Sequence, residues 1–191
     1  MKNCGFDEAM AKQIEANYHV LYKVSDDWVQ AHLTKAAKVG YVEAAFGLRV
    51  RTPLLAQVVR GTSRTPYEAE AEGRTAGNAL GQSWCMLTNR ASAEFLGKVR
   101  KSKYRLDIRP FAHIHDAQYM LVRDDVEVVE YTNNTLVDAV CWQDDPLIAH
   151  DEVKLGGNFG IFYPNWANEI ELKNYASQKE IVATIDKALA V

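Results

Sequence analysis

The side chains best suited to chemistry lie in the segment RPFAHIHDAQYMLV, residues 109–122. Two short runs of β-forming apolar residues, 111–114 and 119–122, flank a polar middle that contains His115 and Asp116. This pattern predicts a buried β-hairpin with an imidazole and a carboxylate at its tip. The middle contains neither glycine nor asparagine, which two-residue hairpin turns usually require. Turn formation therefore does not account for Asp116, and we expect its carboxylate to have another role.

A second group of polar side chains recurs at steps of four along a predicted helix. They are Arg74, Asn78 and Gln82, and each follows a glycine. The three glycines cost about 3 kcal/mol relative to alanine and leave a strip without bulk on the helix. Arginine pairs with phosphate and the amides can donate to base edges, so this face suits a large polar anion. Packing of another helix on the glycines, with the polar residues in solvent, accounts for the spacing equally well.

The composition is that of one globular domain. The chain has 191 residues, 48% hydrophobic and 25% charged. Its net charge of −3 excludes a strongly basic nucleic-acid coat protein but not a local basic groove. No apolar stretch is long enough to span a membrane, and the first ten residues lack the apolar core of a signal peptide. Cys4, Cys85 and Cys141 are far apart and not at metal-ligand spacing, so we expect a reduced, cytoplasmic protein.

Hydrophobic spacing predicts long helices in the first half of the chain. Apolar residues at steps of three and four predict a helix over residues 7–38, ended by Gly40. The segment that follows predicts a short hairpin that bends at Gly47. A loop is expected over residues 54–66 and a second long helix over residues 66–99.

The second half predicts an α+β chain with few strands. Asp124 or Asp125 can cap a third helix over residues 126–142, and residues 147–155 have the pattern of a strand. A capping box that begins at Ser177 predicts the start of a final helix. The four tryptophans are expected in the core.

These features together resemble the DNA polymerase I family (family A), especially its phage replicative branch. Four landmarks in the family's order carry the resemblance and cover roughly residues 6–168. The segment GYVEAAFGLRVRTP is similar to the family's Gly-Tyr-Val-Glu…Gly-Arg-Arg…Pro segment, and residues 74–82 match its Arg-x-x-x-Asn-x-x-x-Gln helix. His115-Asp116 follows Gln82 by 33 residues, about where the family has its His-Asp-Glu catalytic hairpin. Asn165-Trp166 looks like the family's near-terminal Asn-Trp.

The resemblance implies the C-terminal part of a right-hand polymerase, with antiparallel palm strands that carry the catalytic hairpin, and long helices. Asp116 would be a ligand of two catalytic Mg²⁺ ions, and His115 would lie near the primer terminus. Arg74, Asn78 and Gln82 would contact the primer–template duplex. In such enzymes the two ions activate the primer 3′-hydroxyl and stabilise the departing pyrophosphate during synthesis from dNTPs.

The chain departs from the family in two ways. Ala117 stands where the family has the Glu after its catalytic Asp. The family's Asp-Tyr-Ser-x-x-Glu strand, with the first metal-binding Asp, and its fingers helix have no counterpart. One carboxylate supplies too few oxygen ligands for two ions, so we expect an N-terminal polymerase subunit to bring the other Asp, the fingers helix and a 3′–5′ exonuclease. Residues 1–172 would then form the polymerase fragment, and residues 173–191 a C-terminal helical extension.

Two other functions compete with this interpretation. A non-catalytic DNA-binding or assembly subunit that kept the polymerase fold would account for Ala117. A stand-alone metal nuclease that used His115 and Asp116 would cleave DNA without a partner. A literal His-Asp-Glu triplet at residues 150–152 has no second apolar run returning from it, so we expect it to be an ordinary part of a strand.

Overall fold

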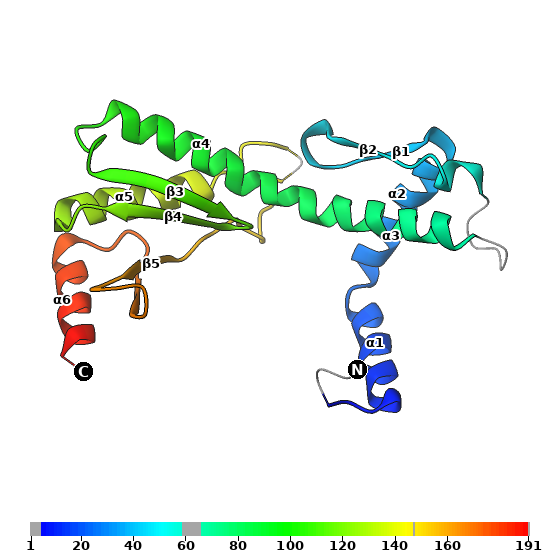
Figure 1. Ribbon diagram of the computed structural model, residues 1–191, viewed down its shortest axis with the longest axis horizontal. Helices are drawn as coiled ribbons and strands as arrows, with labels where there is room; N and C mark the ends of the chain where they lie inside the picture. The colour runs from blue at the N-terminus through cyan, green and yellow to red at the C-terminus, as the bar shows by residue number, and fades with distance from the viewer. Residues whose placement is uncertain (1–4, 59–65, 147, 191) are drawn as a thin grey trace. The chain divides into compact units, whose positions relative to one another are not determined.

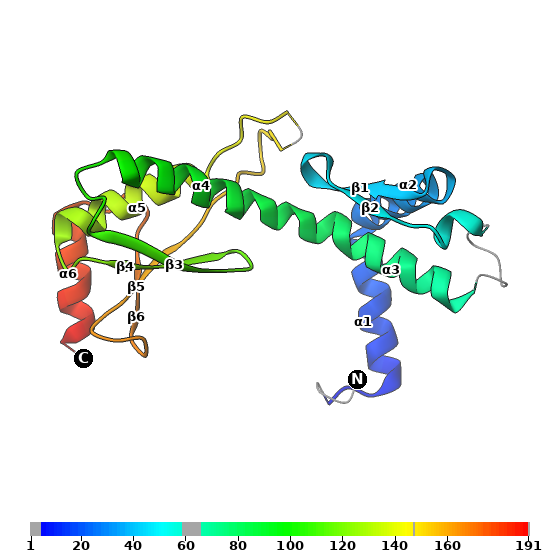
Figure 2. The ribbon, with the colours of Figure 1, turned by 45° about the horizontal axis from the view of Figure 1, so that its top comes forward.

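The computed structural model describes residues 5–58, 66–146 and 148–190. It contains helices and short antiparallel strands, which confirms the α+β class, and Figure 1 and Figure 2 show the course of the chain. Contacts divide the chain into two compact units, Met1–Trp84 and Cys85–Val191. Cys4 and most of the predicted loop after residue 58 lie outside the described residues. None of the described helices is long and apolar enough to cross a membrane.

The first unit begins with two helices where one was predicted over residues 7–38. Helix α1 covers Glu8–Leu21 and helix α2 covers Lys23–Val39. They are separated at Tyr22, whose φ of −104° and ψ of 26° are not helical. The apolar spacing continues through this residue, so periodicity alone could not reveal the break. Gly40 ends α2 in the left-handed conformation, as predicted.

The predicted short hairpin is present after α2. Strand β1 (Tyr41–Glu43) pairs with antiparallel strand β2 (Arg49–Arg51), and Gly47 takes a φ of +75° in the connection. Helix α3 (Tyr67–Gln82) packs with α2 and β1 to close the core of this unit. The buried side chains of that core are Leu33, Ala36, Val42, Leu55, Ala76 and Leu80.

The second predicted helix is also two helices. A 3₁₀ turn, Ser83–Cys85, separates α3 from helix α4 (Met86–Lys101). The hydroxyl of Ser83 donates to the Leu80 carbonyl at 3.0 Å and accepts from the Ala45 N–H at 3.0 Å. A buried hydroxyl that bonds to backbone groups in this way competes with the regular helical ladder.

The predicted hairpin in the second unit is present, but the expectation that it is buried is wrong, because Phe111, Ile114 and Leu121 are exposed. Strand β3 (Ile108–Ile114) pairs with antiparallel strand β4 (Ala117–Val122). Helix α5 (Val126–Val140) follows, and the carboxylate of Asp125 caps it by accepting a hydrogen bond from the Glu127 N–H at 2.9 Å. Figures 1 and 2 show α4 and α5 along one face of the β3–β4 hairpin.

The segment after α5 differs from its prediction. Leu147 lies outside the described residues, and residues 148–155 form no strand. The Nδ1 atom of His150 accepts the backbone N–H groups of Glu152 at 3.1 Å and Val153 at 2.9 Å, which folds this segment into a turn. The strands come later, as an antiparallel hairpin of β5 (Phe159–Phe162) and β6 (Glu169–Leu172).

The final helix, α6 (Gln178–Leu189), begins at the predicted capping box. The hydroxyl of Ser177 accepts from the Glu180 N–H, and the Glu180 carboxylate accepts from the Ser177 N–H at 2.9 Å. Ile181 is fully buried in a core that includes Phe159, Leu172 and Ala176. Helix α6 therefore shares a hydrophobic core with β5 and β6.

Replacing Ile181 by alanine should lower the free energy of unfolding by about 2–5 kcal/mol, because it removes a fully buried side chain from this core. Val182→Ala, one residue on and 44% exposed, is the control and should change it by less than about 0.5 kcal/mol. Urea unfolding followed by circular dichroism measures both. Equal, small effects would contradict the packing of α6 on the β5–β6 hairpin.

Candidate metal-binding hairpin and nucleic-acid interface

The tip of the β3–β4 hairpin is a turn of only two residues, His115 and Asp116. Ile114 and Ala117 form the last pair of the ladder, so nothing else is left in the loop. His115 has a φ of +54°, a region that non-glycine residues rarely adopt. The turn is thus formed without glycine or asparagine, at a cost in backbone strain. Strain of this kind collects at functional sites, where the surrounding structure enforces it.

A β-bulge lies on the strand that leads to this tip. The register shifts between Pro110 and Ala112, so Phe111 is the extra residue on β3. Bulges bend a strand and re-aim its side chains, and they are frequent next to active sites. The bulge was not predicted from the sequence. The signal was Pro110, because proline within a strand is confined to edges and bulges.

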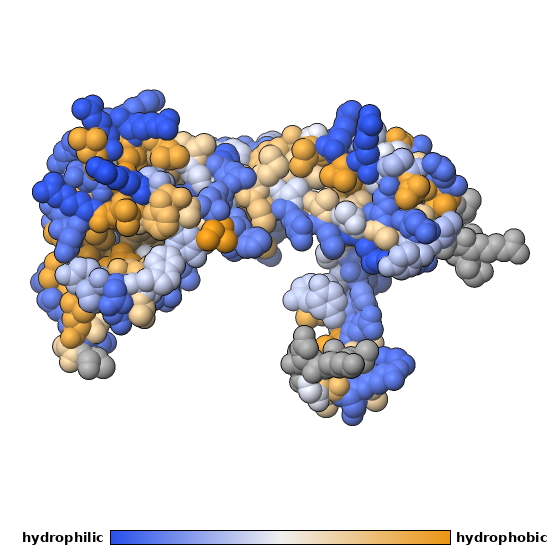
Figure 3. Space-filling view, in the orientation of Figure 1, coloured by the Kyte–Doolittle hydropathy of each residue, from blue (hydrophilic) through white to orange (hydrophobic). Residues whose placement is uncertain are grey.

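The root of the hairpin is anchored while its tip is open. Ile108 is buried with Phe95 and Val99 of α4, and Met120 and Val122 pack against the same core. His115 and Asp116 are both exposed. Figure 3 shows apolar side chains at the surface of this part of the chain, and the exposed ones on the hairpin are Phe111, Ile114 and Leu121.

The carboxylate of Asp116 is available for a ligand. Within the described residues it makes no hydrogen bond and no ion pair. An exposed carboxylate is the oxygen ligand that Mg²⁺ prefers. The part of the chain that is described contains no group of three or more His, Cys, Asp or Glu side chains that could hold a metal ion. Asp116 therefore fits as one ligand of a cation, and the remaining oxygen ligands would come from another molecule.

Helix α3 presents the other predicted site residues to solvent. Arg74, Asn78 and Gln82 are all exposed. The guanidinium of Arg74 lies 3.9 Å from the Glu70 carboxylate and 5.5 Å from the centre of the Tyr67 ring. An exposed ion pair of this length contributes little to stability, so the guanidinium can exchange this partner for a phosphate.

The glycines of α3 do not form the open strip that was expected at their positions. A Cβ atom on Gly73 would lie 3.7 Å from a methyl group of Leu55, and one on Gly77 would lie 3.4 Å from Val29. A Cβ atom on Gly81 would meet nothing within 4 Å. The first two glycines therefore face the core of the first unit, which is the packing alternative. The open face of α3 is formed by the polar side chains.

The structure thus gathers the predicted site residues into two groups. His115 and Asp116 share one hairpin tip, and Arg74, Asn78 and Gln82 lie along one helix. The two groups belong to different compact units.

Trp166 of the predicted Asn-Trp landmark lies against the hairpin. Its ring stacks on Phe162 with centroids 4.4 Å apart, and it contacts Tyr119 of β4 at 5.3 Å. Trp166 is 61% exposed and Trp28 is 42% exposed, so the expectation that all tryptophans are core residues is wrong. Tyr119 and Phe162 are neighbours of the site that sequence reasoning did not single out.

Comparisons with known proteins add no family assignment. Neither the protein-family models nor the curated proteins contain a match to the chain. The functional interpretation therefore depends on the hairpin tip and the polar face of α3.

Two glycine substitutions separate packing from surface roles on α3. Gly81→Ala should raise the free energy of unfolding by about 0.5–1 kcal/mol, because alanine favours the helix and meets nothing there. Gly77→Leu should lower it by about 1–3 kcal/mol, because the larger side chain would overlap Val29 and Leu33. Thermal unfolding of both variants tests this. An unchanged stability for Gly77→Leu would mean that α3 does not pack on α2 at this glycine.

Proposed function

We propose that this chain is the C-terminal subunit of a split family A DNA polymerase. The observation that carries the proposal is the exposed carboxylate of Asp116 at the tip of a two-residue hairpin whose root is packed on α4 and α5. A ligand held in this way stays in position when a cation and a second protein chain meet it. The sequence resemblance at four places along the chain supports the same assignment.

In this proposal the catalytic centre is shared between two chains. Asp116 supplies one carboxylate, and an N-terminal polymerase subunit supplies the other Asp, the fingers helix and a 3′–5′ exonuclease. When bound, Mg²⁺ lowers the pKa of the primer 3′-hydroxyl and stabilises the charge on the departing pyrophosphate. His115, next to Asp116 in the turn, would contact the primer terminus with its imidazole.

The polar face of α3 is proposed to contact the primer–template duplex. Arg74 would pair with a backbone phosphate, which fixes the register of the DNA without reading its sequence. Asn78 and Gln82 carry amide groups that can donate to acceptor atoms on base edges. A polymerase must accept every sequence, and amides that bond to acceptors common to all base pairs meet that requirement.

A non-catalytic assembly subunit is the second candidate, and one observation favours it. Ala117 is the first residue of β4 and pairs with Ile114, so the position after Asp116 carries no carboxylate. A subunit of this kind would bind the partner and DNA, and the rate of DNA synthesis by the complex would not depend on Asp116.

Asp116→Asn should reduce primer extension by the assembled pair of chains by a factor of about 100 or more. The charge that a bound cation stabilises in the transition state is worth several kcal/mol, and each 1.4 kcal/mol is a factor of about ten in rate. The matched control is Asp151→Asn, in the exposed His-Asp-Glu triplet of residues 150–152, which should leave the rate unchanged.

The measurement is single-turnover extension of a labelled primer with Mg²⁺, by this chain alone and with the N-terminal subunit. Full activity of the Asp116→Asn pair would favour the assembly subunit. Rapid synthesis by residues 1–191 alone would contradict the split, and cleavage of DNA by this chain alone would favour the nuclease.

Arg74→Ala should weaken duplex binding by the assembled pair and reduce the slope of log K against log salt by about 1, because one phosphate contact is lost. Lys12→Ala removes an exposed cation from α1 and serves as the control. Fluorescence anisotropy with a labelled duplex at several salt concentrations gives both slopes. Equal salt slopes for Arg74→Ala and Lys12→Ala would show that Arg74 of α3 makes no contact with a DNA phosphate.

A further inference from the structure

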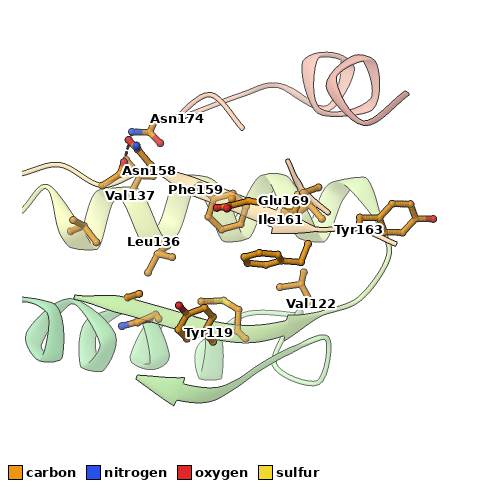
Figure 4. Close-up of a pocket in the computed structure, with 18 of the residues that line it drawn as sticks. Tyr119, Val122, Leu136, Val137, Asn158, Phe159, Ile161, Tyr163, Glu169 and Asn174 are labelled. Atoms are coloured by element: carbon orange, nitrogen blue, oxygen red, sulfur yellow. Dashed lines mark hydrogen bonds between the residues drawn. The ribbon is translucent and has the colours of Figure 1, made fainter. Parts of the chain in front are cut away.

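A cleft of about 910 Å³ lies between β4 and β5 in the second unit, and α5 forms its back wall (Figure 4). Tyr119 reaches into it from β4, Phe159 and Ile161 from β5, and Leu136 from α5. Protein interiors are close-packed and have few voids larger than a water molecule. A cleft of this volume, lined largely by apolar side chains, is large enough to admit a segment of another chain.

The β4 side of the cleft is an unpaired strand edge. At the root of the hairpin the Arg123 N–H donates to the Asp107 carbonyl at 2.8 Å. Bonded and non-bonded pairs alternate along an antiparallel ladder, so Val122 and Met120 direct their backbone groups away from β3. Counting from the two-residue turn gives the same result for Gln118. All three residues line the cleft.

The β5 side is a second unpaired edge. The Tyr163 N–H donates to the Asn168 carbonyl at 3.1 Å, so the same alternation directs the backbone groups of Phe162 and Gly160 away from β6. Both residues line the cleft. Within the described residues, no backbone hydrogen bond reaches either edge from outside its own hairpin. Two exposed edges along one cleft are a template for a strand from another chain.

The remaining lining defines the chemistry of the occupant. Leu136, Val137 and Val140 of α5 form an apolar back wall, so one face of the occupant must be apolar. Gln118 has a buried amide nitrogen without a hydrogen-bond partner in the described structure, and a backbone carbonyl would accept from it. The charged lining residues are Asp116, Arg123, Asp124 and Glu169. This excess of carboxylates is complementary to basic residues at the ends of the occupant.

We infer that the cleft binds one extended segment of a partner chain as a β-strand between β4 and β5. The segment has alternating apolar residues that face α5, and basic residues flank it. Its paired length matches the 6 residues of β4. That the segment belongs to the N-terminal polymerase subunit rests on the proposed function. Asp116 lines one end of the cleft, so this strand would bring a residue of the partner to the catalytic carboxylate.

The test uses the full chain and a synthetic octapeptide in which valine and threonine alternate between terminal lysines. Amide hydrogen exchange is measured by NMR with millimolar peptide, without Mg²⁺, DNA or a partner protein. The peptide should slow exchange at Gln118, Met120 and Val122 by a factor of ten or more. Leu121, whose N–H faces β3, should change little. Uniform slowing along β4, or none, would overturn the inference.

Two controls separate strand pairing from adhesion to the apolar wall. A peptide with proline in place of each threonine lacks the N–H groups for one edge and should not slow exchange. The variant Gln118→Pro removes an N–H that β3 does not use, and an edge strand tolerates it. It should lose the effect of the valine–threonine peptide, whereas Val153→Ser, exposed and outside the cleft, should keep it.

The outcome is independent of the polymerase assignment. If the peptide slows amide exchange in β4 and the assembled chains with Asp116→Asn retain full primer extension, the strand site stands and the catalytic role of Asp116 is rejected. If the peptide does not slow exchange and Asp116→Asn abolishes primer extension, the catalytic role stands and the strand site is rejected. Protection of β4 that grows with protein concentration in the absence of peptide would show that a second copy of this chain occupies the cleft, and the inference would fail.

Discussion

The packing of the β3–β4 hairpin on α4 and α5 is the constraint on which the candidate site depends. Ile108 is buried with Phe95 and Val99 in this core, and Met120 and Val122 lie against it. A two-stranded hairpin is only marginally stable alone, so this contact holds the strands in a fixed register. With the root fixed, the two-residue turn has little freedom. The backbone position of Asp116 is therefore fixed, and its exposed carboxylate has no hydrogen-bond partner in the described residues.

Two features of the second unit are incomplete within the described residues: the ligand set of a cation at Asp116, and the hydrogen bonding of strands β4 and β5. Asp116 offers a cation a single carboxylate, and β4 and β5 each have one hydrogen-bonded neighbour and one unpaired edge. Soluble proteins usually cover or charge such edges. In the proposed assembly a second chain would supply oxygen ligands at the hairpin tip and backbone groups along the strands.

Local signals in the sequence predicted the elements whose cause is local. The left-handed Gly40, the Asp125 cap and the Ser177 capping box each depend on one side chain and a few neighbouring backbone groups. Two predictions of secondary structure were wrong because of side-chain hydrogen bonds that the spacing of apolar residues does not reveal. His150 folds the expected strand into a turn through its ring nitrogen, and Ser83 divides the expected long helix. The spacing of the glycines on α3 was visible in the sequence. That Gly73 and Gly77 face the core depends on packing against Leu55 and Val29, which the spacing does not reveal.

The proposed strand site and the proposed cation site meet at the Asp116 end of the cleft, and this gives the proposed assembly a thermodynamic consequence. Acidic residues outnumber basic ones in the lining of the cleft. The guanidinium of Arg123, the basic lining residue, is 3.4 Å from the carboxylate of Asp107, which does not line the cleft. In the proposed assembly the basic flanks of the strand are attracted to the carboxylates of the cleft, while the partner's metal-binding Asp beside Asp116 is repelled until a cation binds between the two carboxylates. By linkage, a cation that strengthens docking of the strand is itself bound more tightly by the docked complex, and by the same factor. Assembly of the subunits and formation of the metal centre are then a single coupled equilibrium.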